Sequence, residues 1–358
     1  MMDTSRAWIE IDRAALRHNV EALGKLLPPG CALMPAVKAN AYGHGAVAVA
    51  RECQSMGVND FCVAALAEGI ELRQNGIGGT ILILGWTDPI KAHLLYEYKL
   101  TQTVMGLDYA KELDGLGKSI DVHIKIDTGM HRLGVNWECP EEMVRIFKCK
   151  NLRVTGAYTH LCADSFAEEQ GRRFYQTAAL LREAGCAIPK VHLLASGGLL
   201  RHAELGGDYA RVGLALYGIG SKELRPVLSL KARVAQVREI PAGESAGYGL
   251  RFTARRPSRI AVLTIGYGDG LPRSLSCGAG SVLVRGRRAP VAGMVCMDQT
   301  LIDVTDIPEA ASGDMAVLIG KSGAEEIGAA ELAARAGTIP NEVLSGLGRR
   351  LYAQQTQP

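Results

Sequence analysis

The chain has 358 residues, of which 47% are hydrophobic and 22% are charged, and its formal net charge is +3. It is long enough for one large domain and a smaller one, and apolar enough to fold into a sizeable core. The small positive charge is spread along the chain, which argues against binding to nucleic acid or to an anionic membrane surface. The longest apolar runs, such as TILILGW from Thr80, fall short of the roughly 18 residues that a membrane span needs.

Nine cysteines are scattered along the chain without a CxxC pair or the close Cys/His spacing of a zinc site. An odd, unpatterned set of this kind is typical of reduced thiols in a cytoplasmic protein. The sequence therefore predicts a cytoplasmic location and no metal site.

Short apolar runs alternate with amphipathic stretches through residues 33–217. The expected strands are Leu33–Val37, Phe61–Ala65, Ile81–Leu84, Thr101–Val104, Val122–Ile126, Val154–Tyr158, Val191–Leu194 and Val212–Tyr217. Eight strand–helix alternations over roughly 220 residues predict a parallel (β/α)8 TIM barrel in the α/β class. A doubly wound open sheet is the alternative, but the dinucleotide glycine fingerprint after the first strand is missing.

After about Ser221 the pattern changes to β-rich runs that are interrupted by Gly and Pro. We therefore expect two domains, a barrel over residues 1–222 and a C-terminal all-β domain over residues 223–358.

Polar residues recur where each expected barrel strand ends, and a TIM barrel places its active site at these carboxyl ends. They are Lys38, Lys125, Arg132, His160, Ser196 and the segment Arg211 to Leu214. Any one of them alone could be an ordinary exposed loop residue, but their shared position favours a common site.

Two glycine-containing segments follow the seventh strand and open the eighth, where barrel enzymes often bind phosphate. ASGG from Ala195 and RVGL from Arg211 supply a hydroxyl group and backbone N–H donors there. A lysine at the first strand end together with a phosphate site suggests pyridoxal 5'-phosphate held as a Schiff base on Lys38.

AVKANAYGHG, around this lysine, resembles the cofactor-lysine motif of the alanine racemases, which are barrel-type (fold type III) pyridoxal-phosphate enzymes. Further motifs resemble that family in the same order along nearly the whole chain: HIKIDTGMHRLGV from His123, GAYTHLCADS from Gly156, RVGLALYG from Arg211, GYG from Gly247, IGYGDG from Ile265 and CMDQ from Cys296.

The resemblance implies a homodimer with shared active sites, in which Lys38 and Tyr248 of the other subunit are the two catalytic bases. It assigns the cofactor to Lys38, Tyr42, Arg132, His160, Ser196, Arg211, Gly213 and Leu214. It assigns the substrate to Arg132, Tyr267, Met297, Asp298 and Asn341. Within this set Arg211 would bind the pyridine nitrogen, and Lys125 would be the lysine that many family members carry as a carbamate. An ordinary rim lysine is the alternative for Lys125.

Two positions depart from the alanine racemase pattern. Asn341 occupies the place of a tyrosine that narrows the substrate pocket, and Ala195 stands where the family commonly has Asn. A shorter amide opens volume and offers a donor and an acceptor to a serine hydroxyl, which a pocket shaped for methyl leaves unpaired at a cost of about 1–3 kcal/mol. Neutral change of a loop residue is the alternative.

The combination resembles the racemase domains of the membrane-anchored serine racemases in vancomycin-resistance clusters. Those proteins carry an N-terminal membrane region, and an upstream tether of that kind would explain why AWIEIDRAAL follows the start so closely. The chain itself is not expected to contact a membrane.

We therefore expect an isomerase that interconverts L- and D-serine, with alanine as a secondary substrate. One alternative is an alanine racemase that supplies D-alanine to peptidoglycan in the cell wall. Others are a non-catalytic pyridoxal-phosphate-binding barrel, against which the β domain and Tyr248 argue, and a barrel decarboxylase, against which Arg211 argues because a decarboxylase would pair the pyridine nitrogen with a carboxylate.

Overall fold

The computed structural model describes residues 6–348 and 350–356, which divide into two compact units. We call them the barrel domain and the β domain. The barrel domain consists of Leu16–Ala41 and Ala46–Arg225, and the β domain of the described residues of Met1–Ala15, Tyr42–Gly45 and Pro226–Pro358.

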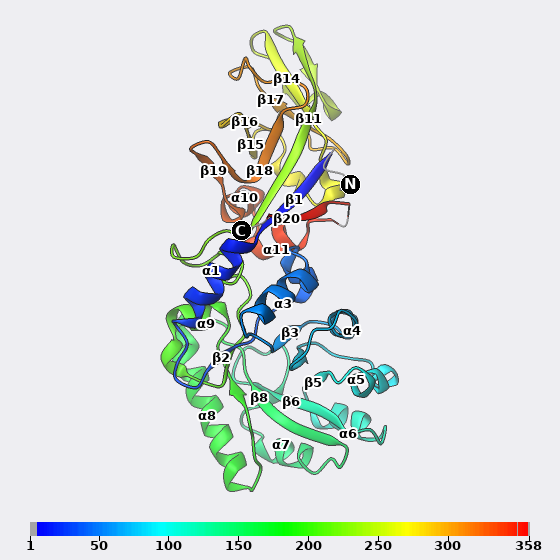
Figure 1. Ribbon diagram of the computed structural model, residues 1–358, viewed down its shortest axis with the longest axis vertical. Coiled ribbons are helices and arrows are strands. Elements are labelled where there is room, and N and C mark those ends of the chain that lie inside the picture. Colours follow the sequence, from blue (N-terminus) through cyan, green and yellow to red (C-terminus); the bar gives the residue numbers. More distant parts are fainter. Residues whose placement is uncertain (1–5, 349, 357–358) are drawn as a thin grey trace. The chain divides into compact units, whose positions relative to one another are not determined.

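The barrel domain contains eight parallel strands in two sheets, which single bridges join into a closed order; Figure 1 labels several of these strands. They are β2 (Ala32–Leu33), β3 (Phe61–Val63), β4 (Ile81–Ile83), β5 (Thr101–Val104), β6 (Ile120–Asp127), β8 (Leu152–Tyr158), β9 (Val191–His192) and β10 (Tyr209–Ala210). Single parallel bridges connect Ala36 to Cys62 and Ala195 to Arg211, and β10 pairs with β2. The predicted (β/α)8 barrel is confirmed.

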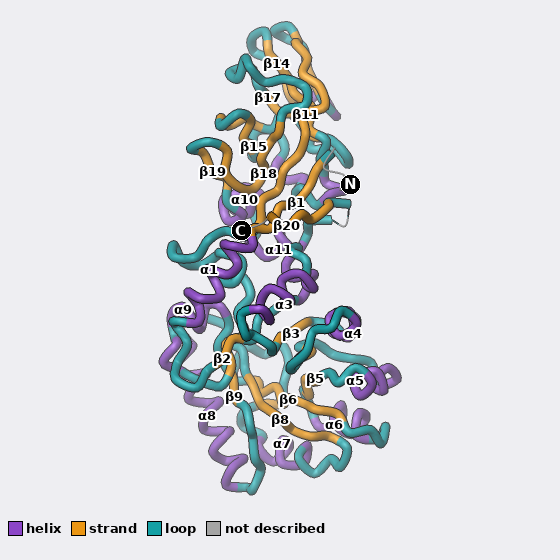
Figure 2. Tube along the Cα trace, in the orientation of Figure 1, coloured by secondary structure: helices purple, strands orange, loops and turns teal. Residues whose placement is uncertain are grey.

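Helices alternate with these strands along the chain, as the colouring of Figure 2 shows. They are α1 (Arg13–Gly24), α3 (Ala46–Ser55), α4 (Leu66–Gln74), α5 (His93–Glu97), α6 (Leu107–Asp114), α7 (Pro140–Ile146), α8 (Ala167–Glu183) and α9 (Ser196–Arg201). Helix α6, for example, buries an apolar stripe of Leu107, Ala110 and Leu113 and exposes a charged face. Short β7 (Val135–Asn136) pairs with the end of β6.

The predicted eighth strand, Val212–Tyr217, is wrong. The strand is β10, and residues 214–218 form a turn in which the N–H groups of Leu216 and Tyr217 donate to the carbonyls three residues earlier. Val212, Leu216 and Tyr217 are nonetheless buried. The apolar run therefore reflects burial, which a strand and a packed turn share.

The β domain is built around β11 (Leu228–Ile240), a long strand that changes partners along its length (Figure 1). Its first half pairs with β1 (Ala7–Asp12) and β18 (Met315–Ser322), and its second half pairs with β14 (Ser258–Leu263). The remaining strands are β12 (Ser245–Ala246), β13 (Phe252–Thr253), β15 (Ser281–Val284), β16 (Arg287–Pro290), β17 (Thr300–Asp303), β19 (Glu325–Ile327) and β20 (Tyr352–Thr356), and the helices are α10 (Ala329–Ala336) and α11 (Pro340–Ser345).

The observed domain division differs from the expected one in the N-terminal strand, which belongs to the β domain. β1 lies between β11 and β20 in the β-domain sheet, although we had assigned residues 1–222 to the barrel. The strand is short and precedes a helix, so the local pattern does not distinguish it from a barrel strand. No helix within residues 6–348 and 350–356 combines the length and the apolar character that crossing a bilayer requires.

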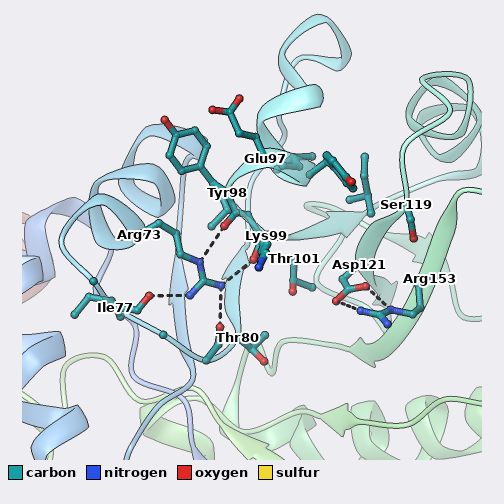
Figure 3. A pocket seen from close by; sticks show the side chains of 17 residues that line it. Arg73, Ile77, Thr80, Glu97, Tyr98, Lys99, Thr101, Ser119, Asp121 and Arg153 are labelled. Atoms are coloured by element: carbon teal, nitrogen blue, oxygen red, sulfur yellow. Dashed lines mark hydrogen bonds and ion pairs between the residues drawn. The ribbon is translucent and has the colours of Figure 1, made fainter.

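A pocket of about 960 Å³ lies at the amino ends of β4, β5 and β6, which is the end of the barrel away from the expected active site. Figure 3 shows that the Arg73 side chain forms hydrogen bonds to the segments that line this pocket. The guanidinium group donates to the carbonyl oxygens of Tyr98 (3.0 Å), Ile77 (2.8 Å), Gly79 (2.8 Å) and Lys99 (2.8 Å). This arginine therefore stabilises two loops at the base of the barrel.

We expect Arg73→Met to lower the free energy of unfolding by about 2 kcal/mol, because backbone carbonyls lose charge-assisted hydrogen bonds. Arg153→Met is the matched control in the same pocket, since Arg153 forms a solvent-exposed ion pair with Asp121 that should contribute little. Urea unfolding followed by circular dichroism measures both. Equal effects of the two substitutions would contradict the structural role of Arg73.

Candidate active site

Lys38 is half-buried and begins α2 (Lys38–Tyr42), which is a left-handed turn. The φ angles of Ala39, Asn40, Ala41 and Tyr42 lie between 50° and 54°. This conformation costs an L-residue about 1–2 kcal/mol, so four in a row persist only where the surroundings stabilise them. The N–H of Ala41 donates to the Val37 carbonyl (2.8 Å), and the Ala46 N–H donates to the Asn40 side chain (2.9 Å).

Arg211 is buried at the start of the loop after β10, and its guanidinium group is held by backbone and side-chain acceptors. Nη2 donates to the carbonyls of Thr159 (2.7 Å) and Leu193 (3.2 Å), and Nη1 donates to the His192 carbonyl (3.1 Å) and to His192 Nδ1 (2.6 Å). Acceptors from the ends of two neighbouring strands therefore fix the position of this cation.

The contact with Arg211 determines the protonation of two buried histidines. Because an arginine can only donate, His192 Nδ1 must be the acceptor, so His192 carries its proton on Nε2 and donates it to His123 Nδ1 (2.9 Å). Burial and the nearby Arg211 lower the pKa of His123 to about 4, and the same two causes lower that of His192. Both rings are neutral near pH 7.

Tyr158 connects this network to Lys125. Its ring stacks on His192 with centroids 5.0 Å apart, and the Arg211 guanidinium carbon and Lys125 Nζ lie 4.9 Å and 5.5 Å from the ring centroid. Lys125 is buried and donates to the Ile126 carbonyl (2.9 Å). Burial and the charge of Arg211 lower the pKa of Lys125 to about 7, so a substantial fraction of this amine is uncharged at neutral pH.

His160 lies just after β8 and is influenced by four cationic side chains, which we call the cationic cluster: Lys38, Lys125, Arg132 and Arg211. Burial is the main reason that its pKa falls to about 3, and the charges of Arg211, Arg132, Lys125 and Lys38 lower it further. All four predicted cations therefore act on one imidazole ring. Arg132 itself is exposed and lies after the turn that Asp127 stabilises by accepting three backbone N–H groups.

Ser196 connects the loops after β9 and β10. Its hydroxyl oxygen accepts the backbone N–H of Gly213 (2.8 Å) and of Ala215 (3.2 Å). Three residues of this domain that we expect to bind phosphate therefore lie together. Ser196 bonds directly to Gly213, and Leu214 is the next residue in the chain.

In the β domain, Tyr248 is 74% exposed, between two glycines with positive φ. It is therefore not a core tyrosine. Tyr267 and Met297 are also exposed, and their loops are joined because the N–H groups of Tyr267 and Gly268 donate to the carbonyls of Cys296 (2.9 Å) and Met297 (2.8 Å).

Asp298 belongs to a chain of ion pairs that fixes the same loops. Arg350 donates to Asp298 (2.8 Å), and its Nε lies 3.1 Å from the buried carboxylate of Asp269. Arg6 adds two bonds to Asp269, at 2.9 and 2.6 Å. Asn341 is half-buried in α11, and its carbonyl accepts the hydroxyl of Ser345 (2.6 Å).

The predicted site residues thus fall into two sets. The barrel domain gathers Lys38, Lys125, Arg132, His160, Ser196, Arg211, Gly213 and Leu214, whereas Tyr42, Tyr248, Tyr267, Met297, Asp298 and Asn341 belong to the compact unit of the β domain. Tyr42 is buried there, and its carbonyl accepts His44 Nδ1–H (2.9 Å).

Comparison with known proteins supports both domains. Residues 11–221 match the family model for the alanine racemase N-terminal domain, and residues 227–354 match that for the C-terminal domain. The chain belongs to the alanine racemase family.

Relatives of this family cover the chain almost completely. An amino-acid racemase from Enterococcus faecalis is 44% identical over 98% of the chain, and the chain spans about half (51%) of that relative's length. An alanine racemase from Nostoc sp. is 41% identical over 97% of the chain and 95% of its own length. The crystal structure of alanine racemase from E. faecalis superposes with a TM-score of 0.92 at 33% identity, covering 99% of this chain and 100% of the other.

Alanine racemase family enzymes are isomerases that use pyridoxal phosphate. The barrel-domain site fits such a group, because four cationic side chains all influence His160, and the same domain joins the hydroxyl group of Ser196 to the backbone of the glycine loop at Gly213. This donor set suits a phosphate, and Lys38 offers an amine to an aldehyde. Within residues 6–348 and 350–356 no group of His, Cys, Asp and Glu side chains could hold a metal ion.

Sequence reasoning missed the residues that support the site. His123 and Tyr158 lie inside the quoted motifs and His192 lies in an expected strand, but buried aromatic residues on strands are indistinguishable from core residues in a sequence. Asp269 lies inside the quoted IGYGDG motif, but its partners Arg6 and Arg350 are distant along the chain and carry no local signal.

We expect the free energy of unfolding of the cofactor-free protein to fall as the pH decreases from about 6.5 to about 4. The pKa of His123 is lower in the folded protein than its value of 6.5 in the unfolded chain. Its contribution to the free energy of unfolding is therefore complete above pH 6.5, and up to about 3 kcal/mol of it is lost as the pH falls to about 4.

The variant His123→Gln can still accept the proton of His192 but does not titrate, so its unfolding free energy should depend less steeply on pH in urea titrations. His93→Gln changes an exposed histidine and is the control. A His123→Gln profile parallel to that of the unsubstituted protein would contradict the assigned protonation.

Proposed function

We propose that the protein is a pyridoxal-phosphate-dependent amino-acid racemase that interconverts L- and D-serine, with alanine as a second substrate. The observation that carries the racemase proposal is the fixed position of Arg211 in the cationic cluster that includes Lys38. An arginine at the pyridine nitrogen keeps that nitrogen unprotonated, because its own proton is not released near neutral pH. This arrangement limits side reactions such as decarboxylation and favours return of a proton to the α-carbon.

Pyridoxal phosphate, when bound, withdraws electrons from the α-carbon of the attached amino acid and so acidifies its α-proton. Racemisation removes that proton from one face and delivers one to the other, which requires two bases. We assign these roles to Lys38 Nζ and the Tyr248 hydroxyl oxygen. Ser196, Gly213, Leu214 and Tyr42 would hold the phosphate, and Arg132 would lie beside the phenolic oxygen of the cofactor. Met297 and Asp298 would approach the substrate carboxylate from the second subunit.

We infer that Tyr248 acts in the partner subunit of a homodimer. Its side chain is exposed in the single chain, and so are Leu250 and Met297. Exposed large apolar residues beside a functional group are typical of a surface that another chain covers.

The serine preference rests on Asn341. It is half-buried at the start of α11. A tyrosine at position 341 would fill space that the amide leaves open. Alanine racemisation, with supply of D-alanine to peptidoglycan, is the second candidate. Several proteins that are similar to this chain are alanine racemases.

Two further assignments belong to this proposal. Carbamylation of Lys125 is supported by its pKa of about 7, since only the neutral amine adds to carbon dioxide, and the resulting anion would pair with Arg132. A cytoplasmic location is supported by the nine free cysteines, all within the described residues.

We expect Tyr248→Phe to lower kcat by about 10²- to 10⁴-fold, because the phenyl ring cannot exchange a proton. The variant should retain the visible absorption of the lysine-bound cofactor, since Tyr248 is not assigned to cofactor attachment. Chiral chromatography of L-serine and L-alanine reactions measures the rates. Full activity of this variant would contradict the two-base assignment.

Mixing Tyr248→Phe with Lys38→Ala extends this test to the shared site. If the two bases come from different subunits, exchange at equal concentrations restores about one quarter of normal activity, because half the dimers are mixed and each has one intact site. If both bases come from one subunit, no mixture has activity.

We expect Asn341→Tyr to shift the ratio of kcat/KM for serine over alanine toward alanine by about ten- to a hundredfold, which corresponds to about 1–3 kcal/mol. Asn341→Gln keeps the amide and is the matched control. Initial rates with both L-amino acids measure the ratio. An unchanged ratio in the tyrosine variant would show that Asn341 does not determine the preference.

A further inference from the structure

The left-handed turn behind Lys38 is held by the side chain of Glu68, a residue with no assigned role in the proposed chemistry. Glu68 lies in the first turn of α4, and one of its carboxylate oxygens, Oε1, accepts the N–H of Ala39 (2.6 Å). Ala39 is the residue directly after Lys38 and the first of the four with positive φ. The carboxylate therefore contacts the turn at the peptide that follows the lysine.

The second oxygen of Glu68 is bonded to a different loop. Oε2 accepts the N–H groups of Ala64 (2.7 Å) and Ala65 (3.1 Å), which lie between β3 and α4. A glutamate in this position ordinarily caps its own helix. Here one carboxylate does more, since it joins the loops after the first two barrel strands, β2 and β3.

The turn needs such external support because its residues do not favour it. Ala39, Ala41 and Tyr42 have a Cβ that crowds the backbone when φ is positive, and only Asn40 belongs to a residue type that tolerates this region. The bond from Ala41 to Val37 is internal to the segment, and Asn40 connects it to the start of α3. Glu68 supplies the bond nearest to Lys38.

We propose that Glu68 is a positioning residue that fixes the left-handed turn and thereby the direction of the Lys38 side chain. This inference rests on the proposed function, in which Lys38 binds pyridoxal phosphate covalently. In that step the Lys38 nitrogen adds to the aldehyde carbon, a carbon–nitrogen double bond forms, and the aldehyde oxygen leaves as water with two protons from the amine. A correctly directed amine accelerates this step, while Ser196, Gly213 and Leu214, which lie outside the turn, keep the phosphate contacts assigned to them.

The test separates covalent attachment from non-covalent binding. Cofactor-free protein is mixed with pyridoxal phosphate, the product is trapped with borohydride at successive times, and modification of Lys38 is measured by peptide mass spectrometry. The affinity for pyridoxine phosphate, which has an alcohol in place of the aldehyde, is measured separately by calorimetry.

Glu68→Gln is the informative variant, because its carbonyl oxygen can still cap α4 while its NH₂ group faces another donor at Ala39. We expect attachment to Lys38 to slow by about tenfold or more, with the affinity for pyridoxine phosphate within about twofold of the unsubstituted protein. Glu68→Asp, which is one methylene too short to reach both loops, should show the same selective loss and serves if the glutamine variant folds poorly.

Glu142→Gln is the matched control, since Glu142 also accepts a backbone N–H, that of Leu107 (2.9 Å), elsewhere in the barrel domain. It should attach the cofactor at the normal rate. Attachment at the normal rate in both Glu68 variants overturns the inference, and so does an equal loss of attachment and of pyridoxine phosphate affinity, which would indicate general damage. Failure of the unsubstituted protein to modify Lys38 would instead overturn the proposed function.

Discussion

The gathering of four cationic side chains near the carboxyl ends of the barrel strands, two of them buried, is the constraint on which the site depends. Lys38, Lys125, Arg132 and Arg211 all act on the His160 ring. Burial first, and the neighbouring cations second, lower the pKa of Lys125 to about 7 and that of His160 to about 3, so both groups lose protons and the repulsion is reduced. Arg211 keeps its charge and is stabilised by four acceptor contacts. A bound phosphate would offset the remaining charge, so the cluster favours an anionic ligand.

The barrel and the positions of its rim residues could be predicted from the sequence because both follow from local patterns. Seven of the expected strands overlap observed strands, and the residues that follow them converge because parallel strands end together. The eighth strand was misplaced because Val212–Tyr217 is a buried turn, and burial alone does not specify backbone conformation. The placement of β1 in the other domain depends on pairing with β11 and β20, which lie far away in sequence.

The backbone conformation of the left-handed turn could not be predicted from the sequence at all. KANAY contains residues that favour right-handed helix, and no local rule assigns positive φ to four of them. The conformation depends on hydrogen bonds to Glu68 and Ala46, which are visible only once the strands are assembled. The conformation of the segment Lys38–Tyr42 is therefore a consequence of tertiary structure, although its lysine could be singled out from the sequence.

The two domains contribute residues of different character, and this difference bears on how specificity can change. Arg211, His192 and Tyr158 are buried and bonded to one another, so a substitution there leaves a donor or acceptor unpaired and affects stability. Asn341 is half-buried, and the hydrogen bond that it receives from Ser345 involves its backbone carbonyl, which any residue provides. Its side chain can therefore be exchanged at little cost to the fold. Under the proposed function, a change in substrate preference is thus expected in the β domain, while the barrel retains the residues proposed to bind the cofactor.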